Sequence, residues 1–450
     1  MKKIITLVCL CVLPFSYVAA EGYQANAQST KQSGMGHVGS ALKLGSESMH
    51  FNPAGLGFLD KTIDISAGFT GVFSTSTYKN DLIKGETDNK PSTPLFLYAG
   101  FKVYDNFSAG ISLTTPYGSG MNWGKNWAGS HLIQEISLKS FSIQPTLSYR
   151  PFERLSIGAG AMIMFGNFSL SRALIPAGGL EGLRPLNPAF GSTLDLFKDI
   201  PAVSATLSGD AGVKIGFNIG AMFDVTDRLT VGVSYRSKVK MQVDEGRAVL
   251  DYANETVLKG LIETVNPFLP DDKKIFIPAL DQGSFKAELP LPSNLNIGVS
   301  YKATDRLLLS GEVQIVGWSA YKILSVQFTQ EILANQHNID ATKNYKNACA
   351  YRIGGQFAAT DRLDLRLGAY IDGSPVQDDF FNPETPSMTR LGLTTGFSFR
   401  PVNRLSIDCS FGYVTGFGRD GSYSEGLTVP FQGHYNLYAL MPSIGISYGF

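Results

Sequence analysis

A four-residue turn, Thr-Asp-Arg-Leu, recurs along this chain between segments in which apolar and polar residues alternate. Three copies are identical, at residues 226–229, 304–307 and 360–363. Three looser copies, each with an acidic or amide residue in the turn, lie at residues 104–107, 152–155 and 402–405. Alternation on both sides of a short polar turn is the pattern of an antiparallel β-hairpin. A repeated unit constrains the fold more than any single motif, so the sequence predicts a long series of hairpins.

The alternation also indicates that these strands cross a membrane. After the turn at 226–229, one face carries Leu229, Val231, Val233 and Tyr235. The other face carries Thr230, Gly232, Ser234 and Arg236. A charged side chain at the middle of a bilayer costs roughly 2–4 kcal/mol, so the apolar face must point to lipid. Because an open strand edge cannot lie in hydrocarbon, the sheet is expected to close on itself.

The number of turns fixes the number of strands. Six short turns join twelve strands, and one more strand is needed at each end if the chain starts and finishes on the side of the turns. We therefore predict an all-β fold, a transmembrane antiparallel β-barrel of fourteen strands with short periplasmic turns and longer outer loops. The last strand alternates up to Phe450 on the lipid face, which resembles the C-terminal signal of bacterial outer-membrane proteins.

The start of the chain has the pattern of a secretory signal peptide over residues 1–20. Lys2 and Lys3 precede an apolar stretch, and Val18-Ala19-Ala20 forms a small-residue cleavage site. Beyond it there is no apolar run of about 18 residues, so no membrane-spanning helix is expected. The formal net charge is zero, which gives no indication of a nucleic-acid partner. The expected location is the bacterial outer membrane.

Cysteine and histidine usage indicates neither a disulfide scaffold nor a metal site. Cys9 and Cys11 leave with the signal peptide, and Cys349 and Cys409 fall on strands that are not expected to be neighbours. The five histidines are scattered without metal-ligand spacing. We predict no cofactor.

Residues 21–60 do not alternate and are rich in glycine, alanine, serine and glutamine. They contain Asn52-Pro53-Ala54-Gly55, in which proline fixes φ and glycine permits positive φ, so a turn is expected. Such a segment ahead of a barrel forms either a disordered tail or a plug inside the lumen. The barrel itself is expected to span residues 61–450.

A series of short motifs runs along the mature chain. The most specific is Phe51-Asn52-Pro53-Ala54-Gly55 ahead of a barrel. Others lie in order at Gly22-Tyr23-Gln24, Gly34-Met35-Gly36, Thr115-Pro116-Tyr117-Gly118, Asn126-Trp127-Ala128-Gly129 and residues 144–149. Together these motifs resemble the FadL family, outer-membrane transporters of long-chain fatty acids and aromatic hydrocarbons. The resemblance covers the mature chain from end to end, and the predicted strand number is the family's number.

The resemblance implies passive transport of a hydrophobic small molecule. The ligand would land on apolar outer loops and enter an apolar pocket above an N-terminal hatch. It would leave sideways into outer-membrane lipid through a gap at a kinked third strand, which avoids the aqueous lumen. The hatch element that rearranges would be Asn52, Pro53, Ala54 and Gly55. The third strand covers roughly residues 107–115, where Gly110 is the candidate for the kink.

Two expected outer loops, at about residues 167–208 and 245–284, are long and apolar. The second contains a helical stripe from Val257 to Val265, with Asn254 as its N-cap and Pro267 as its terminator. The loops either pack on one another as a lid or form a surface groove that captures apolar substrate. The candidates for ligand contact in these loops are Leu174, Leu258, Leu261, Ile262 and Phe268.

Four basic residues are expected to face the lumen by strand alternation, and a fatty acid carboxylate would seek such groups. They are Lys214, Arg352, Arg366 and Arg390. The alternative is that these residues pair with inward-facing acidic residues and with the hatch. Alternation alone does not distinguish the two.

No motif indicates an enzyme. Residues 34–39 have dinucleotide-binding spacing without a preceding strand, and Ser40-Ala41-Leu42-Lys43 lacks the other elements of a penicillin-binding enzyme. A second hypothesis is an interaction protein, a secretion or shuttle component that docks partners through its loops or turns. A water-filled porin is disfavoured by the plug and the apolar loops. We expect the transporter to act as a monomer.

Overall fold

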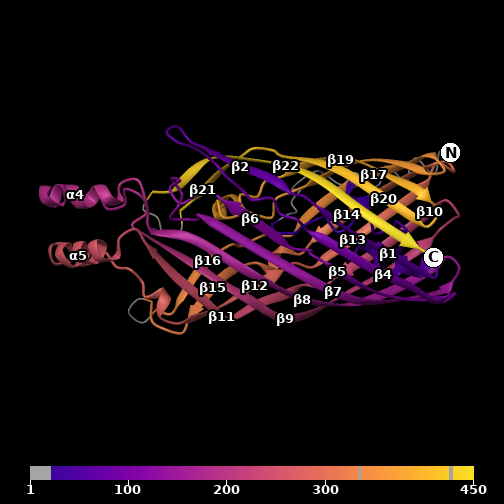
Figure 1. The fold of residues 1–450 in the computed structure, drawn as a ribbon, viewed down its shortest axis with the longest axis horizontal. Helices are drawn as coiled ribbons and strands as arrows, with labels where there is room; N and C mark the ends of the chain where they lie inside the picture. The colour runs from indigo at the N-terminus through magenta and orange to yellow at the C-terminus, as the bar shows by residue number, and fades with distance from the viewer. Residues whose placement is uncertain (1–21, 333–335, 425–428) are drawn as a thin grey trace.

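The structure is a computed structural model that describes residues 22–332, 336–424 and 429–450. The predicted signal peptide therefore lies outside the described residues. The molecule is a long barrel with its hairpin turns and C terminus at one end and two helices, α4 and α5, at the far tip of the other (Figure 1). No helix in the described ranges is long and apolar enough to cross a membrane.

Fourteen strands form the barrel wall, as predicted, and each pairs with its neighbour in an antiparallel ladder. In order around the wall they are β1 (Ile63–Thr70), β4 (Leu95–Tyr104), β5 (Phe107–Thr114), β7 (Glu135–Phe152), β8 (Leu155–Ile175), β9 (Val203–Asp224), β10 (Leu229–Arg236), β13 (Asn294–Lys302), β14 (Leu307–Val316), β17 (Ala348–Thr360), β18 (Leu363–Asp372), β19 (Arg390–Val402), β20 (Leu405–Gly416) and β22 (Phe431–Gly449).

The last strand closes the barrel on the first. β22 pairs with β1 from Asp64↔Gly449 to Thr70↔Ser443. Backbone hydrogen bonds of 2.8 and 3.0 Å join Ile63 and Phe450 in both directions. Phe450 is 48% exposed on the outer face, so the predicted lipid-facing end of the chain is confirmed.

The six predicted turns join consecutive wall strands at the periplasmic end. In the identical copies the threonine hydroxyl stabilises the turn by accepting backbone hydrogen bonds. Thr226 Oγ1 accepts from the backbone N–H of Arg228 at 3.2 Å and of Leu229 at 3.0 Å. Thr304 makes the same two bonds. A threonine side chain that replaces a backbone acceptor explains why this residue begins each copy.

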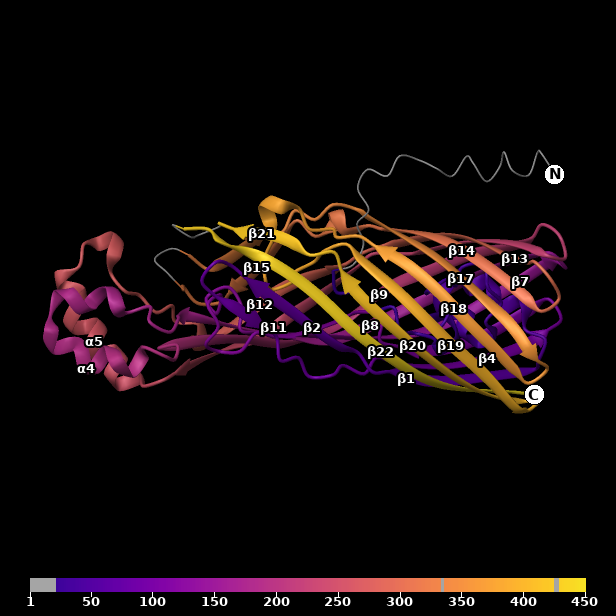
Figure 2. The same ribbon diagram turned by 90° about the horizontal axis from the view of Figure 1, so that it is seen from above.

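Short strands extend the wall beyond the membrane on the outer side (Figure 2). They are β2 (Phe73–Lys79), β3 (Lys84–Glu86), β6 (Gly118–Asn122), β11 (Val239–Tyr252), β12 (Ser284–Leu291), β15 (Ile323–Phe328), β16 (Asn338–Thr342) and β21 (Arg419–Tyr423). The single-turn helix η10 (Trp318–Ala320) lies between β14 and β15, and η11 (Asp378–Phe380) lies between β18 and β19.

The apolar residues change sides where wall strands pass into extensions. On β10, Val233 is 44% exposed to lipid, whereas Val239 on β11 is 4% exposed and packs in the lumen. Ile297 on β13 and Leu291 on β12 differ in the same way, at 49% and 1% exposed. The breaks at residues 237–238 and 292–293 shift the alternation of apolar and polar side chains by one residue. Above the membrane the outer surface of the barrel faces water, so the apolar side chains must point into the lumen there.

Both long loops are shorter than the sequence suggests because their flanking strands continue. β8 reaches Ile175 and β9 starts at Val203, and the second loop runs only from the end of β11 to the start of β12. The loops carry η4 (Glu181–Leu186), η5 (Pro188–Phe190), α4 (Gly191–Leu194), η6 (Asp195–Phe197), α5 (Glu255–Val265), η7 (Asn266–Phe268), η8 (Asp271–Lys273) and η9 (Leu280–Gln282). The predicted N-cap of α5 is confirmed, since Asn254 accepts from Val257 N–H.

The segment after the signal folds inside the lumen, which resolves the choice between tail and plug. It contains α2 (Thr30–Ser33), η2 (Gly45–Glu47), α3 (Ser48–Phe51) and η3 (Pro53–Phe58). Its core side chains are buried, with Met35, Met49 and Leu56 all at 1% exposure or less. We call residues 22–60 the hatch.

Candidate functional site

Asn52 fixes the Asn-Pro-Ala-Gly turn of the hatch. Its Oδ1 accepts from Ala54 N–H at 3.1 Å, which caps η3. Its Nδ2 donates to Ser40 O at 2.7 Å and to Ala221 O on β9 at 3.0 Å. One side chain therefore joins the turn, a second hatch segment and the barrel wall.

The rest of the motif lies directly against the wall. Ala54 O accepts from the Ser156 hydroxyl of β8 at 2.7 Å. A Cβ added to Gly158 would lie 2.4 Å from the backbone carbon of Pro53. Gly55 packs on Ser48 within the hatch, and a Cβ added to Gly55 would lie 2.7 Å from the Ser48 side chain. The motif is thus a tightly seated part of the hatch.

Inward-facing wall glycines let the hatch backbone approach the strands. A Cβ would come within 2.4 Å of the hatch at several of them: Gly158, Gly220, Gly232, Gly298, Gly354 and Gly368. Gly110 is of the same kind, since its Cβ would meet Met49 Sδ at 2.6 Å. It pairs regularly with Gly100 and Thr146, so the pairing register is uninterrupted at this position.

The interruption of the third wall strand lies further along, at residues 115–117 between β5 and β6. Beyond it β6 pairs with β7 only, among the strands described. The start of the hatch covers the break from inside. Ala25 N–H donates to Pro116 O and Gly118 N–H donates to Tyr23 O, both at 2.9 Å.

Above the hatch lies a region that we call the apolar chamber, a cluster of buried aromatic, methionine and aliphatic side chains. It includes Tyr23, Tyr117, Met162, Met241, Leu291 and Trp318. Tyr23 packs edge-on against Trp318 with ring centroids 4.8 Å apart. Its members come from the hatch, from β8 and from the outer extensions, so the chamber forms only when all three are assembled.

Two of the four basic residues predicted to face the lumen are paired with carboxylates. This agrees with the alternative that these residues pair with inward-facing acidic residues. Arg352 lies 3.5 Å from Glu312 and 3.7 Å from Asp372. Arg366 lies between Asp364 at 4.0 Å and Asp408 at 3.9 Å. These pairs also hold the hatch, because Glu312 accepts from Gly39 and Ser40 N–H and Lys31 pairs with Glu47 and Asp408.

The other two basic candidates lie elsewhere. Arg390 faces Asp372 across the β18–β19 ladder. Lys214 on β9 donates to Gln242 Oε1 of β11 at 2.8 Å. Cys349 and Cys409 are free thiols, and no group of His, Cys, Asp or Glu suited to a metal ion occurs in the part of the chain that the structure describes.

Arg236 is a buried basic residue that strand alternation placed inward but did not single out as a candidate. It ends β10 and is 6% exposed. Its Nη2 donates to Nε2 and to the backbone oxygen of His50, both at 2.9 Å. None of the ion pairs between described residues involves Arg236, and its Nε is buried without a hydrogen-bond partner. Its ladder neighbours are Asn218 and Asn294, which only the strand pairing reveals.

Arg236 also lies at the boundary between hatch and chamber. His50 belongs to the hatch helix α3, whereas the Tyr117 hydroxyl, which interacts with the guanidinium, belongs to the chamber. The next inward residue along the chain is Val239 of the chamber. A cation at the floor of an apolar space can hold the acidic end of a molecule whose remainder is apolar.

The outer loop candidates pack on one another at the tip of the molecule (Figure 1). Leu258 and Leu261 of α5 are buried against Leu183, Leu194 and Phe197 of the first loop. Leu174 and Ile262 pack at the edge of this cluster, and Phe268 is 80% exposed. We call these two loops the head. The structure brings its five candidates near one another but not to the chamber.

Residues 12–450 match the model of one protein family, described as outer membrane protein transport protein (OMPP1/FadL/TodX). The chain belongs to this family. Among curated relatives, the long-chain fatty acid transport protein of Escherichia coli K12 is 22% identical over 361 residues, covering 74% of each chain. A 47 kDa outer membrane protein of Pasteurella multocida is 24% identical over 348 residues, covering 76% of this chain and 74% of its own.

Solved structures share the fold of this OMPP1/FadL/TodX member. A Pseudomonas aeruginosa FadL homologue superimposes with a TM-score of 0.76 and 20% identity, covering 96% of this chain and all of its own. The toluene transporter TodX of Pseudomonas putida gives 0.68 at 15% identity, covering 97% and 100%. The protein is therefore an outer-membrane β-barrel of a family that transports hydrophobic substrates, and the members of this family are channels rather than enzymes.

Proposed function

We propose that this transporter passively admits amphipathic acids, molecules with a long apolar tail and one carboxylate, such as fatty acids. The tail would occupy the apolar chamber, and the carboxylate would bind Arg236. The hatch turn Asn52–Gly55 would rearrange to open the path, and the ligand would leave sideways through the break at residues 115–117. The barrel acts as a monomer, and outer-membrane lipid receives the ligand.

The observation that carries the proposal is the unpaired burial of Arg236. Removing a guanidinium from water without a counter-charge costs several kcal/mol, whereas Arg352 and Arg366 in the same lumen have carboxylates beside them. A ligand carboxylate would supply the missing charge and the acceptor that the Nε lacks. A neutral aromatic hydrocarbon would supply neither, so the site favours an acid.

Uptake assays with matched ligands test the proposal. Cells without their own outer-membrane route would carry the protein and receive radiolabelled palmitate or the hydrocarbon of equal length. Arg236→Met keeps the length of the side chain and removes the charge. Because a hydrogen bond to a charged group contributes about 1.5–3 kcal/mol, we expect palmitate uptake to fall by roughly tenfold or more. Hydrocarbon uptake should be unchanged.

The control is Arg247→Met, which removes an exposed arginine from the neighbouring strand β11. It should leave both rates unchanged. Equal palmitate uptake by wild type and Arg236→Met would show that Arg236 does not receive the acid. Absence of palmitate uptake by the wild type would contradict the transport of acids as a whole.

A second candidate function is a docking platform, and the exposed apolar side chains of the head favour it. Phe268, Phe276 and Leu196 are 80%, 59% and 51% exposed. Two loops that only pack on one another as a lid do not require such exposure of large apolar side chains. Replacing the three by serine should not change palmitate uptake if the head only docks a partner. Loss of uptake would assign the head to substrate capture instead.

A further inference from the structure

The barrel wall opens between β9 and β11. A one-residue irregularity borders the opening in each adjoining ladder, between Val243 and Arg247 of β11 and opposite residues 212–213 of β9 on β8. The ladder is regular up to Asn218↔Arg236 and resumes at Ala211↔Val243. The segments between, residues 212–217 and 237–242, are equal in length, so the register is kept. Their contacts are the Ser237–Phe217 pair, with two hydrogen bonds of 2.9 Å, and the bond from Lys214 to Gln242 at 2.8 Å.

Such an opening is unfavourable in a membrane barrel. Backbone N–H and C=O groups that face hydrocarbon without partners cost several kcal/mol each. The adjoining irregularities interrupt pairing locally, but the unpaired stretch is longer on both strands than one extra residue requires. The opening lies where the wall passes from lipid-facing strands into the outer extensions, and Ile215 and Phe217 on its lower part still face lipid. It borders a groove on the outer side and the packed side chains of the apolar chamber on the inner side.

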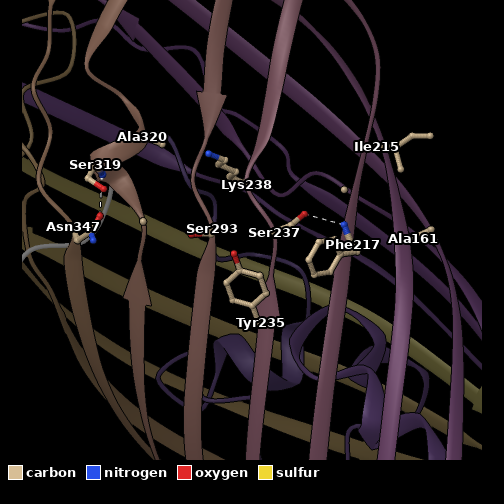
Figure 3. A pocket seen from close by; sticks show the side chains of 12 residues that line it. Ala161, Ile215, Phe217, Tyr235, Ser237, Lys238, Ser293, Ser319, Ala320 and Asn347 are labelled. Atoms are coloured by element: carbon tan, nitrogen blue, oxygen red, sulfur yellow. Dashed lines mark hydrogen bonds between the residues drawn. The ribbon is translucent and has the colours of Figure 1, made fainter.

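On the outer side lies a groove of about 990 Å³. It is bordered by Ile215 and Phe217 of β9, which are 75% and 47% exposed as lipid-facing residues. Figure 3 shows the hydrogen bond between Ser237 and Phe217 of β9 across the opening. Tyr235 and Lys238 lie beside Ser237 on the segment that faces β9. The groove therefore lies at the upper edge of the lipid-facing surface, directly over the opening.

On the inner side lies the apolar chamber. Met162 and Val239 reach the wall at Gly216, where a Cβ would come within 2.7 Å of both. A small apolar cavity of about 30 Å³ lies above them, lined by Ala211, Met241 and Leu291 among others. The opening therefore separates an apolar interior from a lipid-facing groove by the thickness of the wall.

At two positions of the opening β9 carries no side chain. Gly212 and Gly216 flank Lys214, and a Cβ on Gly212 would meet nothing nearer than 3.9 Å. Lys214 is thus the long side chain that spans the opening from β9, and it holds Gln242 by a single hydrogen bond. A lysine can release an amide and neutralise a carboxylate, which an aliphatic side chain cannot do.

We propose that the β9–β11 opening is a second lateral portal, latched by Lys214 and Gln242, through which an amphipathic acid passes between the chamber and the lipid. The proposal rests on the proposed function for its ligand class. The portal is separate from the break at residues 115–117, because β7 and β8 lie between the two. Lys214 would accompany the carboxylate across the wall after Arg236 releases it.

A reversible disulfide cross-link between the two strands tests the portal. Gly212→Cys with Gln242→Cys places two thiols opposite one another across the opening, since these positions face each other in the continued register. The control pair is Ser208→Cys with Arg247→Cys, which join the same strands where they are paired. Both pairs would be made with Cys349 and Cys409 replaced by serine. Palmitate uptake is measured with each pair oxidised and then reduced.

Because the break at residues 115–117 stays open, we expect the oxidised portal pair to lose part of its uptake and to regain it on reduction, while the control pair takes up palmitate equally in both states. Full uptake with the portal disulfide formed would overturn the portal and leave the proposed function intact. Wild-type cells that take up no palmitate would contradict the proposed function itself.

A second measurement needs no variant. Wild-type protein would be irradiated while transporting a palmitate analogue with a photoreactive tail, and the labelled peptides would be identified by mass spectrometry. Label on residues 212–217 and 238–242 supports the portal. Label confined to residues 115–122 and the chamber would overturn it.

Discussion

Asn52 joins the hatch to the barrel wall through one side-chain amide, and its two donor bonds define its role. Asn52→Asp would place a carboxylate against Ser40 O and Ala221 O, which are both acceptors. An unsatisfied buried group costs about 1–3 kcal/mol, so we expect the hatch to dock less stably. Amide hydrogen exchange of residues 40–58 should increase, whereas Pro53→Ala should have little effect. Equal protection in both variants would contradict this role of Asn52.

At the scale of elements, the hatch fits the lumen because glycines replace side chains on the facing strands. A Cβ on Gly232 of β10 would lie 1.9 Å from Ser40 O, while one on Gly311 of β14 would meet nothing nearer than 3.8 Å. Gly232→Ala should therefore displace residues 39–41 and lower the thermal unfolding temperature, and Gly311→Ala should not. Overpacking of this kind typically costs 1–3 kcal/mol. Equal unfolding temperatures would show that the hatch adapts without strain.

For the molecule as a whole, we expect docking of the hatch to weaken as the pH falls. Burial, with Arg352 nearby, lowers the pKa of His37 to about 3. Burial and Arg236 hold the pKa of His50 well below its usual value. Because the docked state keeps both rings neutral, its stability is complete above the unfolded pKa near 6.5. It declines as the pH falls toward 3, the pKa of His37, by about 1.4 kcal/mol per pH unit for that histidine, and protonation of His50 in the undocked state adds to the decline.

Hydrogen exchange of the hatch at pH 7.5 and pH 5 measures this effect. The double variant His37→Gln with His50→Gln retains polar side chains and removes both titrating groups. Its hatch should respond less to acid than that of the wild type. An equal response in the two proteins would assign the acid sensitivity to the lumen carboxylates instead.

The sequence by itself determined the barrel. Two-residue alternation and the Thr-Asp-Arg-Leu turns are local patterns, and they gave the strand number, the lipid-facing side and the periplasmic turns. The N-cap of α5 and the turn at Asn52 are local as well. The positions of the four motif residues were therefore predictable, although their task as a gate remains our proposal.

Only the tertiary structure decided which groups lack partners and where the wall is open. Arg236 differs from Arg352 and Arg366 only in its neighbours, which come from distant strands and from the hatch. The breaks at residues 115–117 and 237–242 are interruptions of pairing between neighbouring strands. Such features depend on contacts between segments far apart in the chain, and local residue patterns carry no information about those contacts.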